Sequence, residues 1–217
     1  MEIKAIIFDL DGTLIDSSKG ILDSLFKAME IYGIKPAITK LDSHFFMGKS
    51  LGETLDILIP GAEQDILKKV GDYYVSHYYD NYIDKAETFE GVPETIKALK
   101  KKGFKMAVAT AKHTYCAQAE LASSGIIDFF QEVRGRDEGV PSKPDPKLLF
   151  EICNKLDVNP SQTLMVGDTD RDVLFGKNAG SFTCAVTYGN WSKQKFIKEN
   201  IIPDFFVDKF PEIISLL

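Results

Sequence analysis

The stretch IKAIIFDLDGTL, residues 3–14, decides the fold class of this chain. An apolar run ends abruptly at Asp9, and a second carboxylate follows at Asp11, directly before Gly12. A short, nearly continuous apolar run is typical of a strand covered on both faces, as in a parallel sheet. Residues two apart on an extended backbone point to the same side, so Asp9 and Asp11 can face one ligand. We expect that ligand at the carboxyl end of the sheet, where open α/β folds bind ligands.

Similar short apolar runs recur along the chain and alternate with amphipathic helical patterns. The predicted strands cover 105–109, 130–133, 163–166 and 182–186, and the predicted helices cover 92–102, 115–123, 146–156 and 170–178. The C-terminal part indicates one more helix, a short strand at 204–207 and a terminal helix. Strands that alternate with helices predict an α/β fold with a parallel-sheet, Rossmann-like core.

The interval 16–89 interrupts this alternation. It contains no convincing strand pattern, and the apolar spacing instead predicts helices over 18–32, 50–59 and 63–79. Glycine and proline residues mark the turns between these helices. We therefore expect a helical cap domain at 16–89, inserted into an α/β core domain that is made of 1–15 and 90–217.

The composition is that of an ordinary globular protein, with a net charge of -6 over 217 residues. We expect no broad basic surface, and therefore no nucleic-acid or membrane partner. The longest apolar runs fall far short of the ~20 residues that a membrane span needs, and the first residues lack a signal-peptide pattern. Cys116, Cys153 and Cys184 lie far apart, which favours reduced thiols in a cytoplasmic protein.

A second acidic group follows the predicted strand at 163–166. Asp168 lies at the end of that strand, and Asp172 comes one helical turn later, within reach of the same site. Clustered carboxylates repel one another, and a bound cation relieves this repulsion at neutral pH. Oxygen ligands without histidine or cysteine favour magnesium over zinc.

Two simpler explanations of these carboxylates stay open. Asp11 and Gly12 could form a plain turn, and Asp168 or Asp170 could cap a helix. Neither explains four carboxylates after two strand ends. A carboxylate such as Asp9, directly after an apolar run, is also costly to desolvate unless a cation compensates.

Two further residues are candidates for holding phosphate oxygens. Thr110 follows the predicted strand at 105–109, and its hydroxyl and the neighbouring amides could bind phosphate at a helix N-terminus. A plain helix cap is the alternative for Thr110. Lys143 lies in a loop between Pro141 and Pro144, which restrict the backbone and hence the directions in which this lysine can point. The alternative for Lys143 is a solvated surface lysine.

Taken in order, four regions resemble the haloacid dehalogenase-like superfamily of phosphatases: DLDGTL at 9–14, Thr110, Lys143 and GDTDRD at 167–172. The similarity extends along nearly the whole chain and includes a helical cap between the first two regions. Within the superfamily, the chain looks most like the phosphoglycolate phosphatases and their pyrophosphatase relatives. The stretches that support this subgroup are FEGVPE at 89–94 and VTYG at 186–189.

The resemblance implies a Mg²⁺-dependent phosphoric monoester hydrolase that acts on a small phosphorylated metabolite. Asp9 would attack phosphorus and become an aspartyl phosphate, which water then hydrolyses. Asp11 would protonate the leaving oxygen and later activate the water. Thr110 and Lys143 would hold the phosphoryl oxygens. The implied metal ligands are a side-chain oxygen of Asp9, the backbone carbonyl of Asp11, and Asp168, with Asp172 nearby or acting through water.

The helical cap should close over this site and contact the leaving group. We expect residues 47–51 to reach inward, because Gly48 permits a close approach and Lys49 can meet an anionic group. Ser50 is a second candidate for a substrate contact. The alternative for Ser50 is an ordinary N-cap of the helix that follows.

Two other functions fit parts of the pattern. A sugar-phosphate mutase would form the same aspartyl phosphate but would pass the phosphoryl group to another hydroxyl instead of water. A non-catalytic regulatory module that binds phosphate could also use carboxylates, a threonine and a lysine at the ends of parallel strands. The helical insertion, and the acid–base candidate Asp11 beside Asp9, disfavour the regulatory module.

Overall fold

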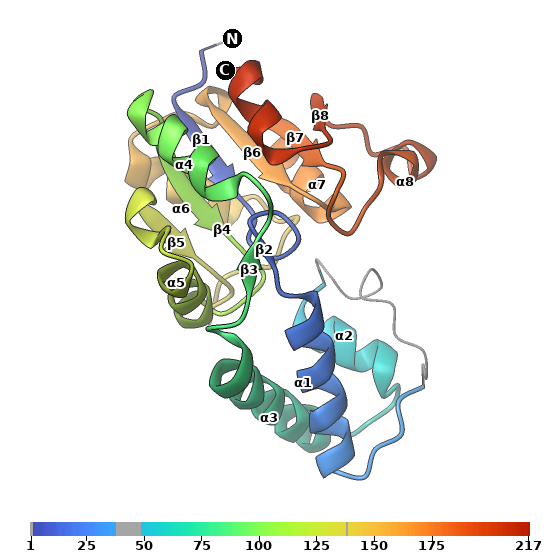
Figure 1. Ribbon diagram of the computed structural model, residues 1–217. Helices are drawn as coiled ribbons and strands as arrows, with labels where there is room; N and C mark the ends of the chain where they lie inside the picture. The colour runs from blue at the N-terminus through green and yellow to red at the C-terminus, as the bar shows by residue number, and fades with distance from the viewer. Residues whose placement is uncertain (1, 38–48, 138) are drawn as a thin grey trace.

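A six-stranded parallel sheet forms the upper part of the molecule in Figure 1. The computed structural model describes residues 2–37, 49–137 and 139–217. The strands, in their order across the sheet, are β5 (Glu132–Arg134), β4 (Lys105–Ala109), β1 (Ala5–Phe8), β6 (Thr163–Gly167), β7 (Phe182–Val186) and β8 (Phe205–Val207). Each neighbouring pair is parallel, so the predicted α/β, Rossmann-like fold is confirmed.

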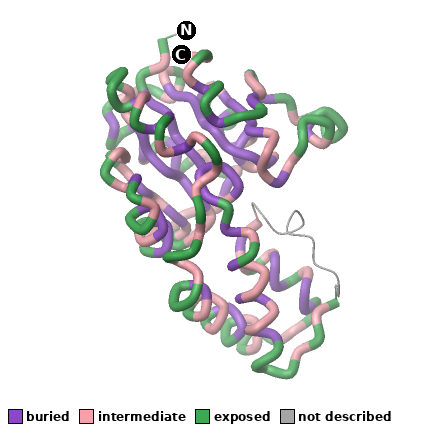
Figure 2. Tube along the Cα trace, viewed as in Figure 1, coloured by how far each residue is buried: buried purple, intermediate pink, exposed green. Residues whose placement is uncertain are grey.

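Helices cover both faces of this sheet. One face carries α4 (Val92–Lys101), α5 (Thr114–Ser123) and the 3₁₀ helix η4 (Phe210–Leu216), and the other carries α6 (Lys147–Leu156) and α7 (Asp170–Ala179). The connections include η2 (Ile127–Phe129), η3 (Pro160–Gln162) and α8 (Lys193–Lys198). The covered strands are buried along their length (Figure 2).

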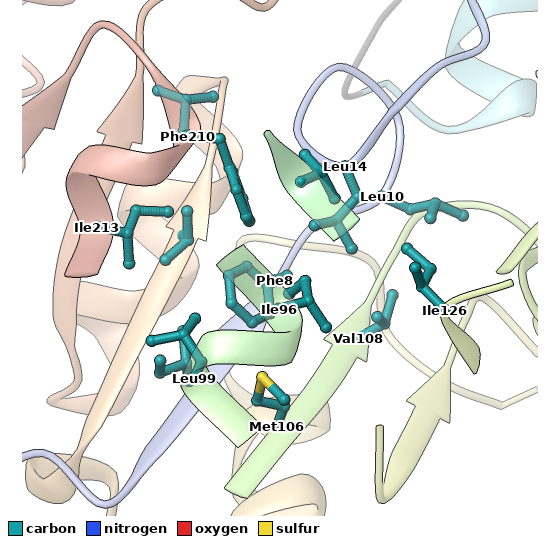
Figure 3. Close-up of a cluster of buried hydrophobic side chains, with 14 of the residues drawn as sticks. Phe8, Leu10, Leu14, Ile96, Leu99, Met106, Val108, Ile126, Phe210 and Ile213 are labelled. Atoms are coloured by element: carbon teal, nitrogen blue, oxygen red, sulfur yellow. The ribbon is translucent and has the colours of Figure 1, made fainter. Parts of the chain in front are cut away.

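The central strand β1 divides its side chains between the two faces. Ile6 and Phe8 belong to one apolar cluster, and Ala5 and Ile7 belong to the other. Figure 3 shows Phe8 inside the first cluster, with side chains from α4, β4 and η4 around it. Because both faces are covered, successive residues of β1 are all apolar, which explains the unbroken run in the sequence.

The order of the strands places a crevice at the end of β1. From β1 the chain continues to β4 and β5 on one side, and it then crosses to β6 on the other side. Phe8 is aligned with Val108 of β4 and with Val166 of β6, so the three strands end at the same level. Loops that leave in opposite directions open a crevice at such a point, and open α/β sheets bind ligands there.

Three helices pack on one another below the sheet in Figure 1. They are α1 (Ser18–Ile31), α2 (Leu51–Leu58) and α3 (Gln64–Tyr82), close to the predicted spans. They bury an apolar cluster of their own, which includes Leu25, Met29 and Leu58. Within the described ranges, every helix lacks the combination of length and apolarity that a membrane-spanning segment requires.

The chain enters this helical part through β2 (Ile15–Asp16) and leaves it through β3 (Glu87–Thr88). The two strands pair in antiparallel orientation. Sequence patterns did not predict them, because two residues carry no measurable periodicity. We propose that this pair is the hinge between a cap domain at 16–89 and a core domain made of 1–15 and 90–217.

Candidate active site

Residues that follow neighbouring strands meet at one cavity. Asp9 and Asp11 follow β1, Thr110 follows β4, Lys143 lies in the loop before α6, and Asp172 lies in the first turn of α7. All five line the same cavity. The structure therefore brings together five of the core residues that the sequence singles out as site candidates.

Lys143 is an internal cation of this site. Its Nζ lies 2.8 Å from Asp9 Oδ1 and 2.7 Å from Asp172 Oδ1, and all three side chains are largely buried. Burial by itself lowers the pKa of Lys143, but the two carboxylates outweigh it and raise the pKa above its ordinary value. Lys143 is therefore a buried ammonium group, and the alternative of a solvated surface lysine is wrong. Arg171 Nη1 donates to the backbone carbonyl of Lys143 at 2.9 Å and so holds the loop in place.

Asp168 follows β6 and is completely buried. Its carboxylate accepts hydrogen bonds from the backbone N–H of Asn190 (2.7 Å), from the Asn190 side-chain amide (2.6 Å) and from the Thr13 hydroxyl (3.2 Å). These donors fix the direction of the carboxylate. Gly12 lies so close that a Cβ on it would come within 2.4 Å of Asp168 Oδ2, and its φ of +81° also excludes most side chains. The Asp-Gly turn thus exists, and it also serves the site.

Asp172 lies in the first turn of α7, and its two carboxylate oxygens bind different partners. Its Oδ1 accepts from Lys143, while its Oδ2 accepts from the backbone N–H (3.1 Å) and the hydroxyl (2.8 Å) of Thr169. Thr169 is the N-cap of α7, and Asp172 completes a capping box with it. The alternative that Asp168 or Asp170 caps this helix is therefore wrong.

Asp9, Asp168 and Asp172 form a cluster in which one carboxylate oxygen of each lies within 4.8 Å of the others. Burial raises the pKa of Asp9 well above its usual range, with Lys143 opposing and the two neighbouring carboxylates reinforcing this shift. Burial and Asp172 likewise raise the pKa of Asp168 to about 7. Lys143 contacts only two of these three carboxylates, Asp9 and Asp172, and the oxygen-only donor set of the cluster fits Mg²⁺.

Asp11 has a different environment from this cluster. Its Oδ1 accepts hydrogen bonds from the Ser17 hydroxyl and from Lys112 Nζ, the latter at 2.7 Å. Its carboxylate lies at the cavity wall and is not one of the three that cluster. A metal contact by Asp11 would therefore come from its backbone carbonyl, and this contact stays a prediction.

Thr110 is buried at the wall of the cavity. Its hydroxyl accepts a hydrogen bond from the backbone N–H of Lys112 at 3.2 Å. The next helix, α5, begins at Thr114 and has His113 as its N-cap. The alternative that Thr110 caps this helix is therefore wrong, and a contact between its hydroxyl and phosphate stays a prediction.

The helical part supplies the opposite wall. Lys49 lines the cavity, together with the apolar side chains of Ile21, Leu25, Leu51 and Val75. Ser50 is the N-cap of α2: its hydroxyl accepts from the backbone N–H of Glu53 (3.3 Å), and Glu53 Oε2 accepts from the backbone N–H of Ser50 (2.8 Å). A substrate contact by Ser50 stays a prediction. Met47 and Gly48 lie outside the described residues.

Sequence reasoning assigned no contact to several residues that hold the site together, although Lys112 follows Thr110 closely enough to border the site. Asn190 binds Asp168 across 22 positions, and Lys112 binds Asp11 across 101 positions, so no local pattern reveals either contact. Arg171 pairs with Glu53 of α2 and so joins α7 to the helical part. The available signals were weak: Lys112 stands two residues after Thr110, and Arg171 stands inside GDTDRD.

A model of the haloacid dehalogenase-like hydrolases matches residues 6–186. The chain belongs to this family. It is 33% identical over 218 residues to a putative pyrophosphatase PpaX of Clostridium perfringens, with 99% of this chain and 97% of the relative covered. It is 31% identical to the pyrophosphatase PpaX of Bacillus anthracis, with 100% of this chain and 97% of the relative covered.

Solved structures of family members agree with the fold. A predicted phosphoglycolate phosphatase from Haemophilus somnus superimposes with a TM-score of 0.86 at 26% identity, over 100% of this chain and 98% of the other. A haloacid dehalogenase-like hydrolase, SP0104 of Streptococcus pneumoniae, has a TM-score of 0.85 at 25% identity, over 99% and 98% of the two chains. This member of the family is therefore an enzyme of the phosphatase group, as the sequence motifs predicted.

Proposed function

We propose that this phosphatase hydrolyses a small phosphate ester in a Mg²⁺-dependent reaction, through an aspartyl phosphate on Asp9. The observation that carries the proposal is the position of the Asp9 carboxylate. It lies at the end of β1, contacts the ammonium group of Lys143, and adjoins two further carboxylates on the wall of a cavity. A carboxylate in this setting is suited to attack a phosphoryl group whose negative charge is offset on the spot.

In the first step, an oxygen of Asp9 forms a bond to phosphorus while the bond from phosphorus to the ester oxygen breaks. Asp11, which lines the same cavity, donates its proton to the departing oxygen. In the second step, water attacks phosphorus and gives a proton back to Asp11, the bond to Asp9 breaks, and inorganic phosphate leaves. Asp11 thus acts first as an acid and then as a base.

Lys143 and Thr110 orient the phosphoryl group during both steps. The Lys143 ammonium reaches the cavity beside Asp9, and the Thr110 hydroxyl lies at the end of the neighbouring strand. Both can bind equatorial phosphoryl oxygens and offset the charge that they carry. Asp9, Asp168 and the Asp11 backbone carbonyl, with Asp172 nearby, would hold Mg²⁺, which would offset negative charge between nucleophile and phosphate.

The substrate that we propose is a small phosphorylated metabolite similar to phosphoglycolate. Lys49 faces the cavity from the helical side, where it can meet an anionic part of the leaving group, and Ser50 adjoins it. Relatives carry the names pyrophosphatase and phosphoglycolate phosphatase, so both substrates are candidates. We propose the cytoplasm as the location, supported by three buried cysteines that are free thiols.

The first prediction concerns Asp9 and tests the mechanism directly. Phosphate release is measured with Mg²⁺ on phosphoglycolate, pyrophosphate, sugar phosphates and nucleoside monophosphates. Asp9→Asn should lower kcat on the order of 10²-fold or more, because it removes the nucleophile. Asp65→Asn, the same change at an exposed position on α3, is the matched control and should keep full activity. Removal of the metal with EDTA should also abolish turnover.

Each contrary result points to a defined alternative. Full activity of Asp9→Asn would refute covalent catalysis by this residue. A rearranged sugar phosphate with little free phosphate would identify a mutase. A protein that releases no phosphate from any ester, but binds phosphate and Mg²⁺, would be a regulatory module.

A further inference from the structure

Lys112 lies at the cavity wall, yet its ammonium group is fully occupied by the protein. Nζ donates to Asp11 Oδ1 (2.7 Å), to Glu120 Oε2 (2.6 Å) and to the Tyr78 hydroxyl (3.2 Å). A lysine ammonium has three N–H donors, so these three acceptors use all of them. Lys112 therefore has no donor left for a phosphate ester, unlike a lysine that binds substrate.

The three acceptors come from three separate parts of the chain. Asp11 follows β1, Glu120 lies on α5, and Tyr78 lies on α3 of the helical part. The Tyr78 hydroxyl also donates to Glu120 Oε1, and Lys112 Nζ lies 4.6 Å from the centre of the Tyr78 ring. The result is a closed network that joins the sheet, a core helix and a helix of the proposed cap.

This network is buried, which makes it costly unless every member is paired. The side chains of Lys112, Asp11 and Glu120 are 8%, 15% and 0% exposed. Burial by itself lowers the pKa of Lys112, but Asp11 and Glu120 outweigh it and raise the pKa well above the ordinary value. Removing one partner of such a network leaves a buried charge without compensation, so its members hold fixed positions.

We propose that Lys112 is a positioning residue that holds the Asp11 carboxyl group toward the cavity, and that Glu120 and Tyr78 fix Lys112 in turn. This inference rests on the proposed role of Asp11 as the acid that protonates the leaving oxygen. A carboxyl group that must reach the leaving oxygen needs a defined direction, and a small displacement costs a large part of the rate. Because Tyr78 belongs to α3, the direction of Asp11 also depends on contact between α3 and the sheet domain.

The test compares two esters that differ in their need for an acid. Phosphoglycolate releases an alkoxide, which requires a proton, whereas p-nitrophenyl phosphate releases a phenolate that is stable without one. The value of kcat/KM covers only the steps up to phosphorylation of Asp9 and so reports on departure of the leaving group. Lys112→Met should lower kcat/KM about 10²-fold for phosphoglycolate and less than about fivefold for p-nitrophenyl phosphate.

The helix partner is tested with a matched pair of variants on α3. Tyr78→Phe removes only the hydroxyl that binds Lys112 and Glu120, and it should lower kcat/KM for phosphoglycolate selectively, by about fivefold. Tyr82→Phe removes a hydroxyl of the same helix, one that donates to Asp23 at 2.8 Å. This variant should leave kcat/KM unchanged for both esters. Equal behaviour of the two variants would refute the part assigned to Tyr78.

A double-variant cycle separates positioning from plain structural support. If Lys112 acts through Asp11, Lys112→Met should add no further loss to Asp11→Asn. Lys112→Met with Glu120→Gln removes the ammonium group together with its fully buried partner, and should show the same selective loss if the single variant folds poorly. An equal loss on both esters, or no loss on either, would overturn the inference while leaving Asp9 chemistry intact.

The role of Asp11 itself is checked by Asp11→Asn alone. A selective loss on phosphoglycolate supports the proposed function, and Lys112 is then judged on its own result. Without that selective loss, the acid role of Asp11 fails, and the inference about Lys112 fails with it.

Discussion

The Asp168 carboxyl group shows how one residue couples folding to the binding of a proton. Burial and Asp172 raise its pKa to about 7, while hydrogen bonds from Asn190 and Thr13 act in the opposite direction. The pKa of Asp in an unfolded chain is about 3.9. Between these two values the native protein binds more protons than the unfolded chain, so stability falls as the pH rises. Burial also raises the pKa of Asp9, which adds to this fall in stability with rising pH.

We therefore predict that the metal-free protein becomes less stable as the pH rises from about 5.5 to 8. Thermal unfolding in EDTA should show a falling Tm across this range. The stabilisation by added Mg²⁺ should grow over the same range, because the cation competes with protons for these carboxylates. In EDTA, the Tm of Asp168→Asn should fall less steeply with pH than the Tm of the parent. Added Mg²⁺ should no longer stabilise this variant. A Tm that falls with pH as steeply in the variant as in the parent would contradict the prediction.

The site residues that could be predicted from the sequence are those that directly follow a recognisable strand. Asp9 and Asp168 stand directly after buried strands, and the ends of parallel strands meet at one edge. The contacts of Lys112 and Asn190 were not predictable, because their partners lie 101 and 22 positions away. Their contacts depend on how loops close over the sheet, which no local pattern encodes.

Among the secondary-structure elements, α2 has Ser50 as its N-cap, and this task occupies the hydroxyl that could otherwise contact substrate. Ser50 and Glu53 form a reciprocal capping box at the helix start, and Glu53 also pairs with Arg171 of α7. Burial by itself raises the pKa of Glu53, but the hydrogen bonds from Ser50 and the charge of Arg171 leave it below the ordinary value. The Ser50 hydroxyl is thus engaged within its own helix, whereas Lys49 faces the cavity.

Ser50→Ala should lower the free energy of unfolding by about 1 kcal/mol, the usual cost of losing an N-cap. For a chain of this length, we expect a fall in Tm of about 2–4 °C. Its kcat/KM should change less than about twofold, as the hydroxyl serves the helix. Glu53→Gln keeps a capping-box residue but removes the ion pair, and it serves as the control for stability. A large loss of kcat/KM in Ser50→Ala at unchanged Tm would instead support contact with substrate.

The elements themselves were predictable where apolar periodicity runs for a full strand or helix. The five-residue strands β4 and β7 begin and end at the predicted positions, and the three inserted helices are shifted by only a few residues. The two-residue strands β2 and β3 carry no such periodicity. Their pairing comes from the geometry of the insertion as a whole, not from local sequence preference.

Across the whole molecule, the apolar interior is divided. Among the described residues, the sheet has a large cluster on each face and a smaller one around Ala185 of β7, and the three inserted helices bury a separate cluster of their own. Leu58 lies fully buried in the helical cluster, and Leu149 lies fully buried under the sheet. A segment with its own apolar interior is able to open without disturbing the rest.

We predict that Leu58→Ala loosens the helical part alone. Hydrogen exchange should accelerate in α1, α2 and α3, while the amides of β1 and β6 keep their protection. The matched variant Leu149→Ala, with the same loss of volume, should accelerate exchange in the sheet. Each substitution should lower the free energy of unfolding of the part that contains it by about 2–5 kcal/mol. Uniform acceleration across the chain in Leu58→Ala would show a single cooperative unit and refute the proposed boundary at 16–89.

The pairing of β2 with β3 has a consequence for how such a protein can diversify. The insertion begins and ends at adjacent points, since Ile15 pairs with Thr88 and the backbone of Phe89 donates to Leu14. A segment anchored in this way can be lengthened, exchanged or redesigned without moving any strand of the sheet. Such an exchange would keep the residues that follow the strands of the sheet, but it would have to preserve the contact of the Tyr78 hydroxyl with Lys112 and Glu120.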